Sequence, residues 1–146
     1  MGLAAVQLAR AAGAKPYVTA GSQQKIDKAK SVGALDGINR HVSEGKWKDR
    51  FLELTDNHGA DVILDCVGAT YALQNAEVLA TEGRWVLYGT MGGTQTEAGP
   101  LLGLLLRKRG QILASTLRTR SLQYKADLVA NFVKEAWPKL ADGTFQ

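Results

Sequence analysis

Two long apolar segments that end in glycine constrain the fold of this chain more than any other feature. Residues 60–68 read ADVILDCVG, residues 83–89 read GRWVLYG, and a segment with a helical pattern near 71–79 separates them. Continuous apolar runs are typical of strands that are buried on both faces, as in a parallel sheet covered by helices. The two segments therefore predict two buried strands of an α/β fold.

The rest of the chain alternates between strand and helix patterns in the same way. Further strands are predicted near 16–20, 37–39 and 111–117, and further helices at the amino terminus, near 22–32 and 46–55, after Pro100, and over 122–140. This alternation predicts a doubly wound parallel sheet, Rossmann-like, in one domain with one core. In that architecture ligands bind at the carboxyl ends of the strands.

Composition limits the possible function classes. The chain has 146 residues, a formal net charge of +4 and one cysteine, Cys66. A single cysteine excludes an internal disulfide framework, and His41 and His58 have no neighbours at zinc-ligand spacing, so no metal site is predicted. The amino-terminal MGLAAVQLARAAGAK reads as neither a signal peptide nor a membrane span. We therefore expect a cytoplasmic protein without membrane contact.

The first predicted strand ends without an acidic residue. In many nucleotide-binding units an acid at this point binds the ribose 2′-hydroxyl of NAD. Residues 17–25 read YVTAGSQQK, in which Gly21 permits a tight turn, and Ser22 and Lys25 offer a hydroxyl and an ammonium group at a helix start. These groups suit an anion such as a phosphate.

Four motifs, in this order and spacing, resemble a known family: VTAGSQQK, GADVILDCVG, EGRWVLYGTMGG and ILASTLRTR. They are similar to the cofactor-binding domain of zinc-independent, zeta-crystallin-like NADPH:quinone oxidoreductases of the medium-chain dehydrogenase/reductase superfamily. The resemblance covers nearly the whole chain and implies hydride transfer from NADPH to a quinone or related enone. It makes residues 1–146 a partial dinucleotide-binding domain that lacks its first strand, with the amino-terminal catalytic domain absent.

The resemblance also implies cofactor contacts. Gly2 resembles the last glycine of the family's phosphate loop, while Gly21, Ser22 and Lys25 resemble its 2′-phosphate contacts, so NADPH is expected rather than NADH. Arg40 stands where the family often has a tyrosine, and it could stack near the adenosine or pair with the 2′-phosphate. The later contacts are Cys66, Val67 and Gly68 beside the adenosine ribose, Gly89, Met91, Gly92 and Gly93 near the nicotinamide, and Ser115, Thr116 and Leu117 beside the carboxamide. No catalytic residue is implied.

Simpler interpretations stand beside these assignments. Lys25 could be a solvated residue in a first helical turn, Cys66 is most simply a small core residue, and Gly68 and Gly89 could merely end strands. Three tryptophans recur at helix or strand spacing and are predicted to be core residues: Trp47, Trp85 and Trp137.

Other functions and partners follow from the remaining features. A basic group could bind RNA and make the chain a non-catalytic nucleotide- or RNA-binding module, but no aromatic platform interleaves its members, so a solvated or interface role is favoured. Its members are Arg107, Lys108, Arg109, Arg118 and Arg120. A doubly wound methyltransferase is disfavoured because it normally has an acid after its second strand. The apolar strand at 111–117 lies on a sheet edge, which predicts a homodimer through that edge.

Overall fold

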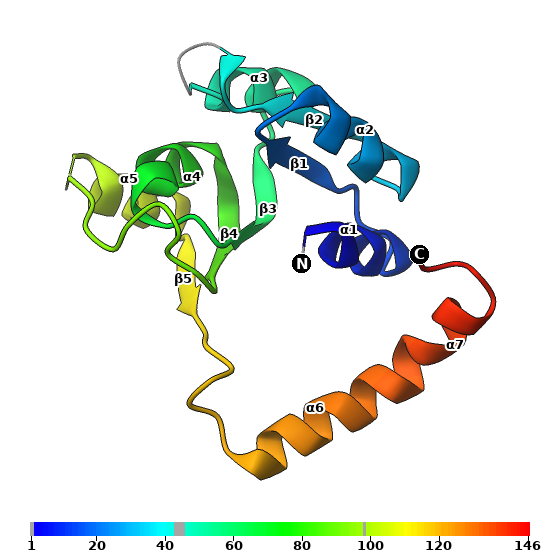
Figure 1. Ribbon diagram of the computed structural model, residues 1–146. Helices are drawn as coiled ribbons and strands as arrows, with labels where there is room; N and C mark the ends of the chain where they lie inside the picture. Colours follow the sequence, from blue (N-terminus) through cyan, green and yellow to red (C-terminus); the bar gives the residue numbers. More distant parts are fainter. Residues whose placement is uncertain (1, 43–45, 98) are drawn as a thin grey trace. The chain divides into compact units, whose positions relative to one another are not determined.

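The computed structural model describes residues 2–42, 46–97 and 99–146, and in these residues five strands form two separate parallel sheets (Figure 1). The chain divides accordingly into a terminal unit, residues 1–45 and 119–146, and a central unit, residues 46–118. Each unit has its own sheet and its own hydrophobic cluster. The sequence predicted one core, whereas the described residues contain at least these two separate clusters.

The terminal unit contains a two-stranded sheet and four helices among its described residues. These elements are α1 (Gly2–Ala11), β1 (Tyr17–Ala20), α2 (Gln23–Ser31), β2 (Asp36–Asn39), α6 (Leu122–Glu135) and α7 (Trp137–Ala141). Val6 of α1 and Ala29 of α2 are buried together with Ala34, and Val18 of β1 packs against them. Ala20 pairs with Asn39, so β1 and β2 end side by side.

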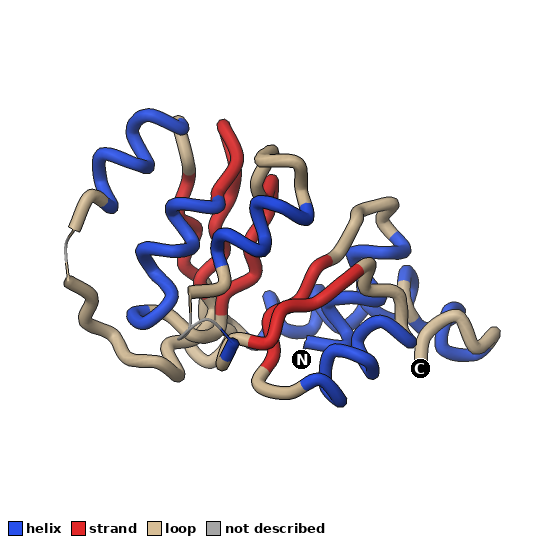
Figure 2. Tube along the Cα trace, turned by 90° about the horizontal axis from the view of Figure 1, so that it is seen from above, coloured by secondary structure: helices blue, strands red, loops and turns tan. Residues whose placement is uncertain are grey.

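The central unit contains a three-stranded sheet in the order β3-β4-β5. Its elements are α3 (Lys48–Leu54), β3 (Ala60–Asp65), the short 3-10 helix η2 (Ala69–Tyr71), α4 (Ala72–Val78), β4 (Leu79–Leu87), α5 (Leu101–Lys108) and β5 (Gln111–Ala114). Trp85 of β4 is buried against Ala72 of α4 and Leu79, with Leu101 and Leu105 of α5 packed around them. The three strands run side by side with helices against them (Figure 2).

The strand order explains the division into two sheets. A Rossmann-type sheet has the order 3-2-1-4-5-6. The pair β2-β1 corresponds to strands 3 and 2, and β3-β4-β5 corresponds to strands 4, 5 and 6, so the two sheets are what remains of that order without strand 1. The predicted fold class, a doubly wound Rossmann-like sheet lacking its first strand, is confirmed.

Several strand boundaries differ from the prediction. β3 ends at Asp65 instead of continuing to residue 68, and β4 begins at Leu79 rather than near residue 83 and contains an irregularity. Its pairing with β3 shifts between Ala60 and Val62, and Glu82 has a left-handed φ of 63°. β5 ends at Ala114 instead of continuing to residue 117.

The single helix predicted over 122–140 is two helices. Pro138 has no amide hydrogen to continue the helical ladder, so α6 ends at Glu135 and α7 begins at Trp137. Trp47 and Trp85 are core residues as predicted, but the prediction for Trp137 is wrong, because that side chain is 59% exposed. None of the helices in the described part of the chain has the length and apolar character needed to cross a bilayer.

Candidate functional site

The exit of β1 in the terminal unit combines groups that favour an anion. Ser22 is the N-cap of α2, and its Oγ accepts a hydrogen bond from the Lys25 amide at 3.4 Å. Because capping uses only the oxygen, the hydroxyl hydrogen can still be donated to a ligand. Ile26 is buried and anchors this turn, while Lys25 is exposed. The helix start, with no acidic residue in its first turn, adds the positive end of the helix dipole.

Arg40 and His41 lie over the backbone of Gly21. A Cβ atom on Gly21 would lie 3.3 Å from His41 Nε2 and 3.5 Å from Arg40 Nη2. This arrangement follows from the pairing of Ala20 with Asn39, because the residues after each strand emerge next to each other. The structure therefore brings the predicted contact Arg40 to the predicted turn at Gly21, together with His41, which the sequence did not predict as a contact.

Gly2 begins α1 and is exposed. A Cβ atom on Gly2 would meet nothing within 4 Å, so packing does not require glycine at this position. Its contact with a pyrophosphate stays a prediction.

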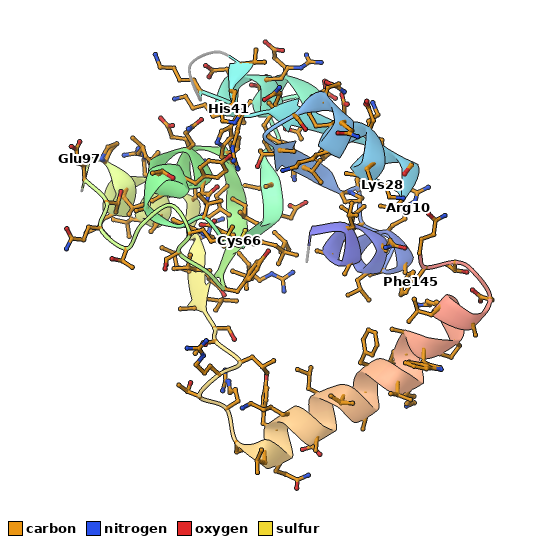
Figure 3. All side chains as sticks on the ribbon, viewed as in Figure 1. Arg10, Lys28, His41, Cys66, Glu97 and Phe145 are labelled. Carbon is orange, nitrogen blue, oxygen red and sulfur yellow. The ribbon has the colours of Figure 1, made fainter. Side chains whose placement is uncertain are left out.

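Two turns after β3 and β4 of the central unit are hydrogen-bonded to each other. The amide of Met91 donates to the Cys66 carbonyl at 3.1 Å, and the amide of Gly92 donates to the Val67 carbonyl at 2.7 Å. A third bond runs the other way, from the Ala69 amide to the Gly93 carbonyl, at 3.1 Å. Figure 3 labels Cys66 at the end of β3. These bonds bring together most of the predicted contacts of this unit: Cys66, Val67, Gly68, Met91, Gly92 and Gly93.

The close approach of the two turns excludes side chains at two glycines. A Cβ atom on Gly68 would lie 2.9 Å from the Gly93 carbonyl oxygen, and the φ of Gly68 is +80°. A Cβ atom on Gly92 would lie 2.8 Å from Val67 Cγ1 and closer still to Thr70 Oγ1. Packing between the turns is therefore sufficient to explain both glycines.

Gly68→Ala is expected to destabilise the chain by about 1–3 kcal/mol, because alanine is strained in the left-handed region and its Cβ would clash with backbone. Gly103→Ala in α5 is the matched control, since its Cβ would meet only the flexible Arg107 side chain, at 3.5 Å. Alanine favours a helix over glycine by up to about 1 kcal/mol, so this variant should be stabilised. Chemical denaturation measures both free energies of unfolding, and equal changes would contradict the expectation.

Four amides of the two turns donate to acceptors within the protein. Those of Val67 and Gly68 donate to Asp65 Oδ1 at 2.6 Å and 3.1 Å. Those of Met91 and Gly92 donate to carbonyl oxygens, as described above. A phosphate bound here would have to displace these bonds, whereas an uncharged ring or a ribose would not.

Tyr88 follows β4 and interacts with Cys66. Burial raises the pKa of the Tyr88 phenol above its ordinary value, and the electrostatic interaction with Cys66, a hydrogen bond with the Cys66 side chain and the charge of Asp65 raise it further. The phenol therefore stays protonated to a higher pH than an ordinary tyrosine.

Absorbance titration at alkaline pH tests the state of Tyr88. The difference between the wild-type chain and Tyr88→Phe is expected to show a phenol that ionises above the ordinary tyrosine pKa of about 10. Cys66→Ala should lower this pKa, because it removes two of the causes. Since the folded pKa lies above the unfolded one, the stability that Tyr88 contributes is present below a pH of about 10 and is lost as the pH rises through the folded pKa. Ionisation below the ordinary value would contradict this.

The third group of predicted contacts in the central unit follows β5. The amide of Ser115 donates to the Leu87 carbonyl at 2.9 Å, which holds Ser115 beside the end of β4. Thr116 and Leu117 follow it and are exposed.

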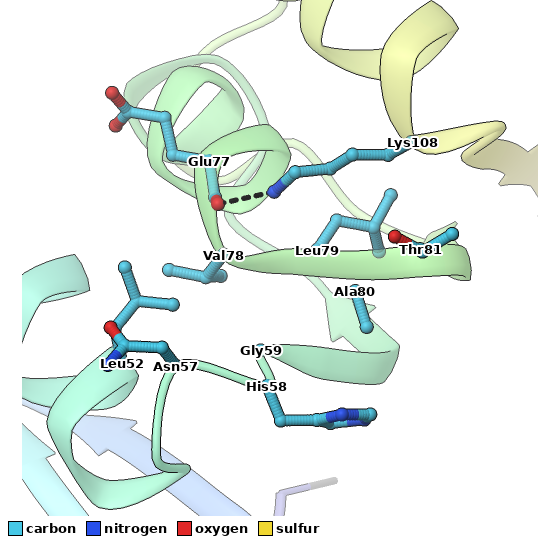
Figure 4. A pocket seen from close by; sticks show the side chains of 10 residues that line it. All are labelled: Leu52, Asn57, His58, Gly59, Glu77, Val78, Leu79, Ala80, Thr81 and Lys108. Atoms are coloured by element: carbon cyan, nitrogen blue, oxygen red, sulfur yellow. Dashed lines mark hydrogen bonds between the residues drawn. The ribbon is translucent and has the colours of Figure 1, made fainter.

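A pocket of the central unit lies at the other, amino-terminal ends of β3 and β4 (Figure 4). His58, Gly59 and Lys108 are among its lining residues, and none of the predicted cofactor contacts is. The Lys108 ammonium donates to the carbonyl oxygens of Ala76 and Glu77 at the end of α4. Burial lowers the pKa of Lys108, while the nearby Glu77 carboxylate opposes this effect. The Lys108 ammonium group in this pocket therefore caps the carboxyl end of α4.

The basic group that could bind RNA is partly engaged within the protein. Lys108 holds the end of α4, and Arg109 Nε lies 3.1 Å from Glu82 Oε1. The Arg120 guanidinium lies over the Tyr124 ring, 4.8 Å from its centroid. Three of its five members therefore make contacts within the protein.

A family model described as zinc-binding dehydrogenase matches residues 1–134 of the chain. The chain belongs to the zinc-binding dehydrogenase family. Its fold is that of the nucleotide-binding domain of the medium-chain dehydrogenase/reductase superfamily. The matched residues include every predicted cofactor contact.

Curated and solved relatives agree with this assignment. The chain is 39% identical over 80 residues to quinone oxidoreductase-like protein 2 of Rattus norvegicus, an alignment that covers 55% of the chain and 22% of that protein. It superposes on Escherichia coli quinone oxidoreductase complexed with NADPH with a TM-score of 0.78 and 28% identity, covering 99% of this chain and 43% of that one. The nucleotide-binding subdomain of the enoylreductase domain of PpsC from Mycobacterium tuberculosis gives a TM-score of 0.74 and 28% identity, over 99% of this chain and 78% of that one.

The family is named for zinc binding, and zinc requires a specific set of ligands. A zinc site in a protein takes three or four His, Cys, Asp or Glu ligands. Within the described ranges, no three such side chains lie close enough together to hold a metal ion. These residues therefore do not fit a zinc site.

Proposed function

We propose that this chain is the NADPH-binding part of a reductase. Residues 1–146 form a partial dinucleotide-binding domain that works with a separate amino-terminal catalytic domain, in the cytoplasm. The observation that carries this proposal is the β1 exit, where Ser22 and Lys25 stand at a helix start and Arg40 lies over Gly21. An NAD-specific site needs an acidic acceptor here, while a 2′-phosphate needs donors and positive charge.

The residues present fit NADPH by their chemistry. Ser22, Lys25 and Arg40 would bind the 2′-phosphate, and Gly2 at the start of α1 would approach the pyrophosphate. The glycine turns of the central unit, with amides already paired within the protein and no room for side chains, suit a ribose and a ring better than a phosphate. Bound NADPH would supply the hydride. The remaining proposed contacts are Cys66, Val67, Gly68, Gly89, Met91, Gly92, Gly93, Ser115, Thr116 and Leu117.

Quinones or related enones are the proposed substrate class, reduced without zinc. The quinone oxidoreductase relatives support this class, and the enoylreductase relative supports an activated carbon–carbon double bond as the common feature of the substrates. The acceptor is expected to be bound mainly by the separate catalytic domain.

Fragments of the cofactor test the proposal directly. Adenosine 2′,5′-bisphosphate and adenosine 5′-phosphate differ only in the 2′-phosphate, and their affinities for the 146-residue chain can be compared by NMR titration. The bisphosphate is expected to bind about tenfold or more tightly, with the largest amide shifts at Gly21, Ser22 and Arg40. Equal affinities would reject NADPH as the cofactor, and no binding of either would reject the nucleotide site.

A homodimer through β5 is also proposed. β5 is the last strand of its sheet, and its Ile112 and Leu113 are 42% and 45% exposed. An apolar edge strand of this kind pairs readily with a second copy. Analytical ultracentrifugation is expected to show a dimer at micromolar concentration and a monomer for Leu113→Lys. A monomeric wild type, or a dimer that survives the substitution, would argue against this edge.

A further inference from the structure

Four hydrogen bonds converge on the carboxylate of Asp65, the last residue of β3. Oδ2 accepts from Asn75 Nδ2 and from Trp85 Nε1, each at 3.0 Å. Oδ1 accepts from the amides of Val67 and Gly68 at 2.6 Å and 3.1 Å. Asp65 is only 3% exposed, so these donors satisfy its oxygens in place of water.

The two oxygens are bound to different kinds of structure. Asn75 of α4 and Trp85 of β4 are buried in the core, and they fix Oδ2 within the central unit. The amides on Oδ1 belong to the turn after β3, where cofactor contacts are proposed. Asp65 therefore connects the rigid core to that turn.

Peptide geometry extends this connection to the next turn. The Val67 amide and the Cys66 carbonyl belong to one planar peptide unit, and the Gly68 amide and the Val67 carbonyl belong to the next. The amide side of each unit donates to Asp65, and the carbonyl side accepts from Met91 N at 3.1 Å or from Gly92 N at 2.7 Å. Fixing the two planes at Asp65 thus fixes the backbone of residues 91 and 92.

We propose that Asp65 is a positioning residue that orients residues 90–93 toward the cofactor through these two peptide units. The proposal rests on the proposed function of the chain as a cofactor-binding domain. Asp65 acts through the turns and not by direct contact, because both its oxygens are already bound to protein donors.

Asp65→Asn tests this role, because it replaces one acceptor oxygen by an NH₂ group that must face one of the two donor pairs. Asn75→Ala is the matched control, since it removes a donor from Oδ2 but leaves Oδ1 and the turn amides paired. Hydrogen exchange of the Met91 and Gly92 amides is measured without nucleotide and corrected for global unfolding. Exchange is expected to be about tenfold or more faster in Asp65→Asn than in Asn75→Ala.

Equal exchange in the two variants would overturn the proposal, because Asp65 would then act through core stability alone. The wild-type chain supplies a second measurement that does not depend on whether the variant folds. The amides of Val67, Gly68, Met91 and Gly92 should open together, with protection factors that agree within about threefold. Independent opening of the two turns would overturn the coupling.

NADPH titration separates this proposal from the proposed function. Asp65→Asn is expected to bind NADPH about tenfold more weakly than Asn75→Ala. Equal NADPH affinity of the two variants, with a wild type that binds NADPH, would overturn the positioning role alone. A wild-type chain that binds no NADPH would overturn the proposed function, and the orientation toward a cofactor with it.

Discussion

Lys25→Ala is expected to weaken the binding of adenosine 2′,5′-bisphosphate by about ten- to a hundredfold, because a charge-assisted hydrogen bond contributes about 1.5–3 kcal/mol. Binding of adenosine 5′-phosphate should hardly change, since it lacks the phosphate that Lys25 is proposed to contact. NMR titration of the 146-residue chain with each ligand gives the two affinities. Lys25→Ala is likewise expected to weaken the binding of NADPH by about ten- to a hundredfold and to leave the binding of NADH almost unchanged.

Lys28→Ala is the matched control for this experiment. Lys28 lies on the same helix, is also exposed, and its replacement changes the net charge by the same amount (Figure 3). Salt at physiological concentration screens exposed charges beyond about 8 Å, so a lysine that does not contact the phosphate should have little effect. Equal losses in Lys25→Ala and Lys28→Ala would show that α2 acts only through its overall charge. Equal losses for both ligands in Lys25→Ala would show that Lys25 does not bind the 2′-phosphate.

The candidate site shows which contacts a sequence can predict. Gly21, Ser22 and Lys25 leave one strand and enter one helix, so their proximity follows from a single continuous segment. His41 follows another strand, and only the pairing of Ala20 with Asn39 brings it over Gly21. In a parallel sheet neighbouring strand ends lie side by side, so the residues after both strands can be examined together once the pairing is known.

The hydrogen bonds of Asp65 show a second limit to what can be predicted from the sequence. In the sequence it is the polar end of an apolar strand, and nothing near it indicates that it is saturated with donors. Two of those donors are backbone amides close in sequence, but Asn75 and Trp85 are ten and twenty residues away. Their convergence depends on how α4 and β4 pack in the central unit, which local patterns do not encode.

Some features of the fold depend on local sequence and could be predicted, whereas others depend on contacts between distant segments and could not. The strands were predictable because their apolar runs and glycine exits are local signals. The separate hydrophobic clusters of the described residues were not predictable, because the division of a core depends on which strands pair with each other. The break between α6 and α7 belongs to the predictable class, since Pro138 is visible in the sequence and cannot continue a helix.

Residues 1–146 on their own are expected to bind NADPH weakly and to reduce no quinone at a measurable rate. A Rossmann-type domain holds the pyrophosphate on a glycine-rich loop between its first strand and first helix. In residues 1–146 the described strands form two separate sheets, and neither sheet contains a strand that leads into α1. The amides that would shape the pyrophosphate site are therefore not supplied by these residues.

Hydride transfer also requires a substrate held against the nicotinamide, and such orientation can supply about 7–11 kcal/mol of barrier reduction. The chain covers 43% of the length of the E. coli relative, and we propose that the substrate is held by a part that corresponds to the remainder. Purified chain is mixed with NADPH and a water-soluble quinone, and the loss of NADPH absorbance is followed. NADPH with quinone alone gives the background, and the full-length E. coli enzyme is the positive control. Turnover at about 1 per second or faster, in the range of ordinary enzymes, would show that residues 1–146 contain a complete active site.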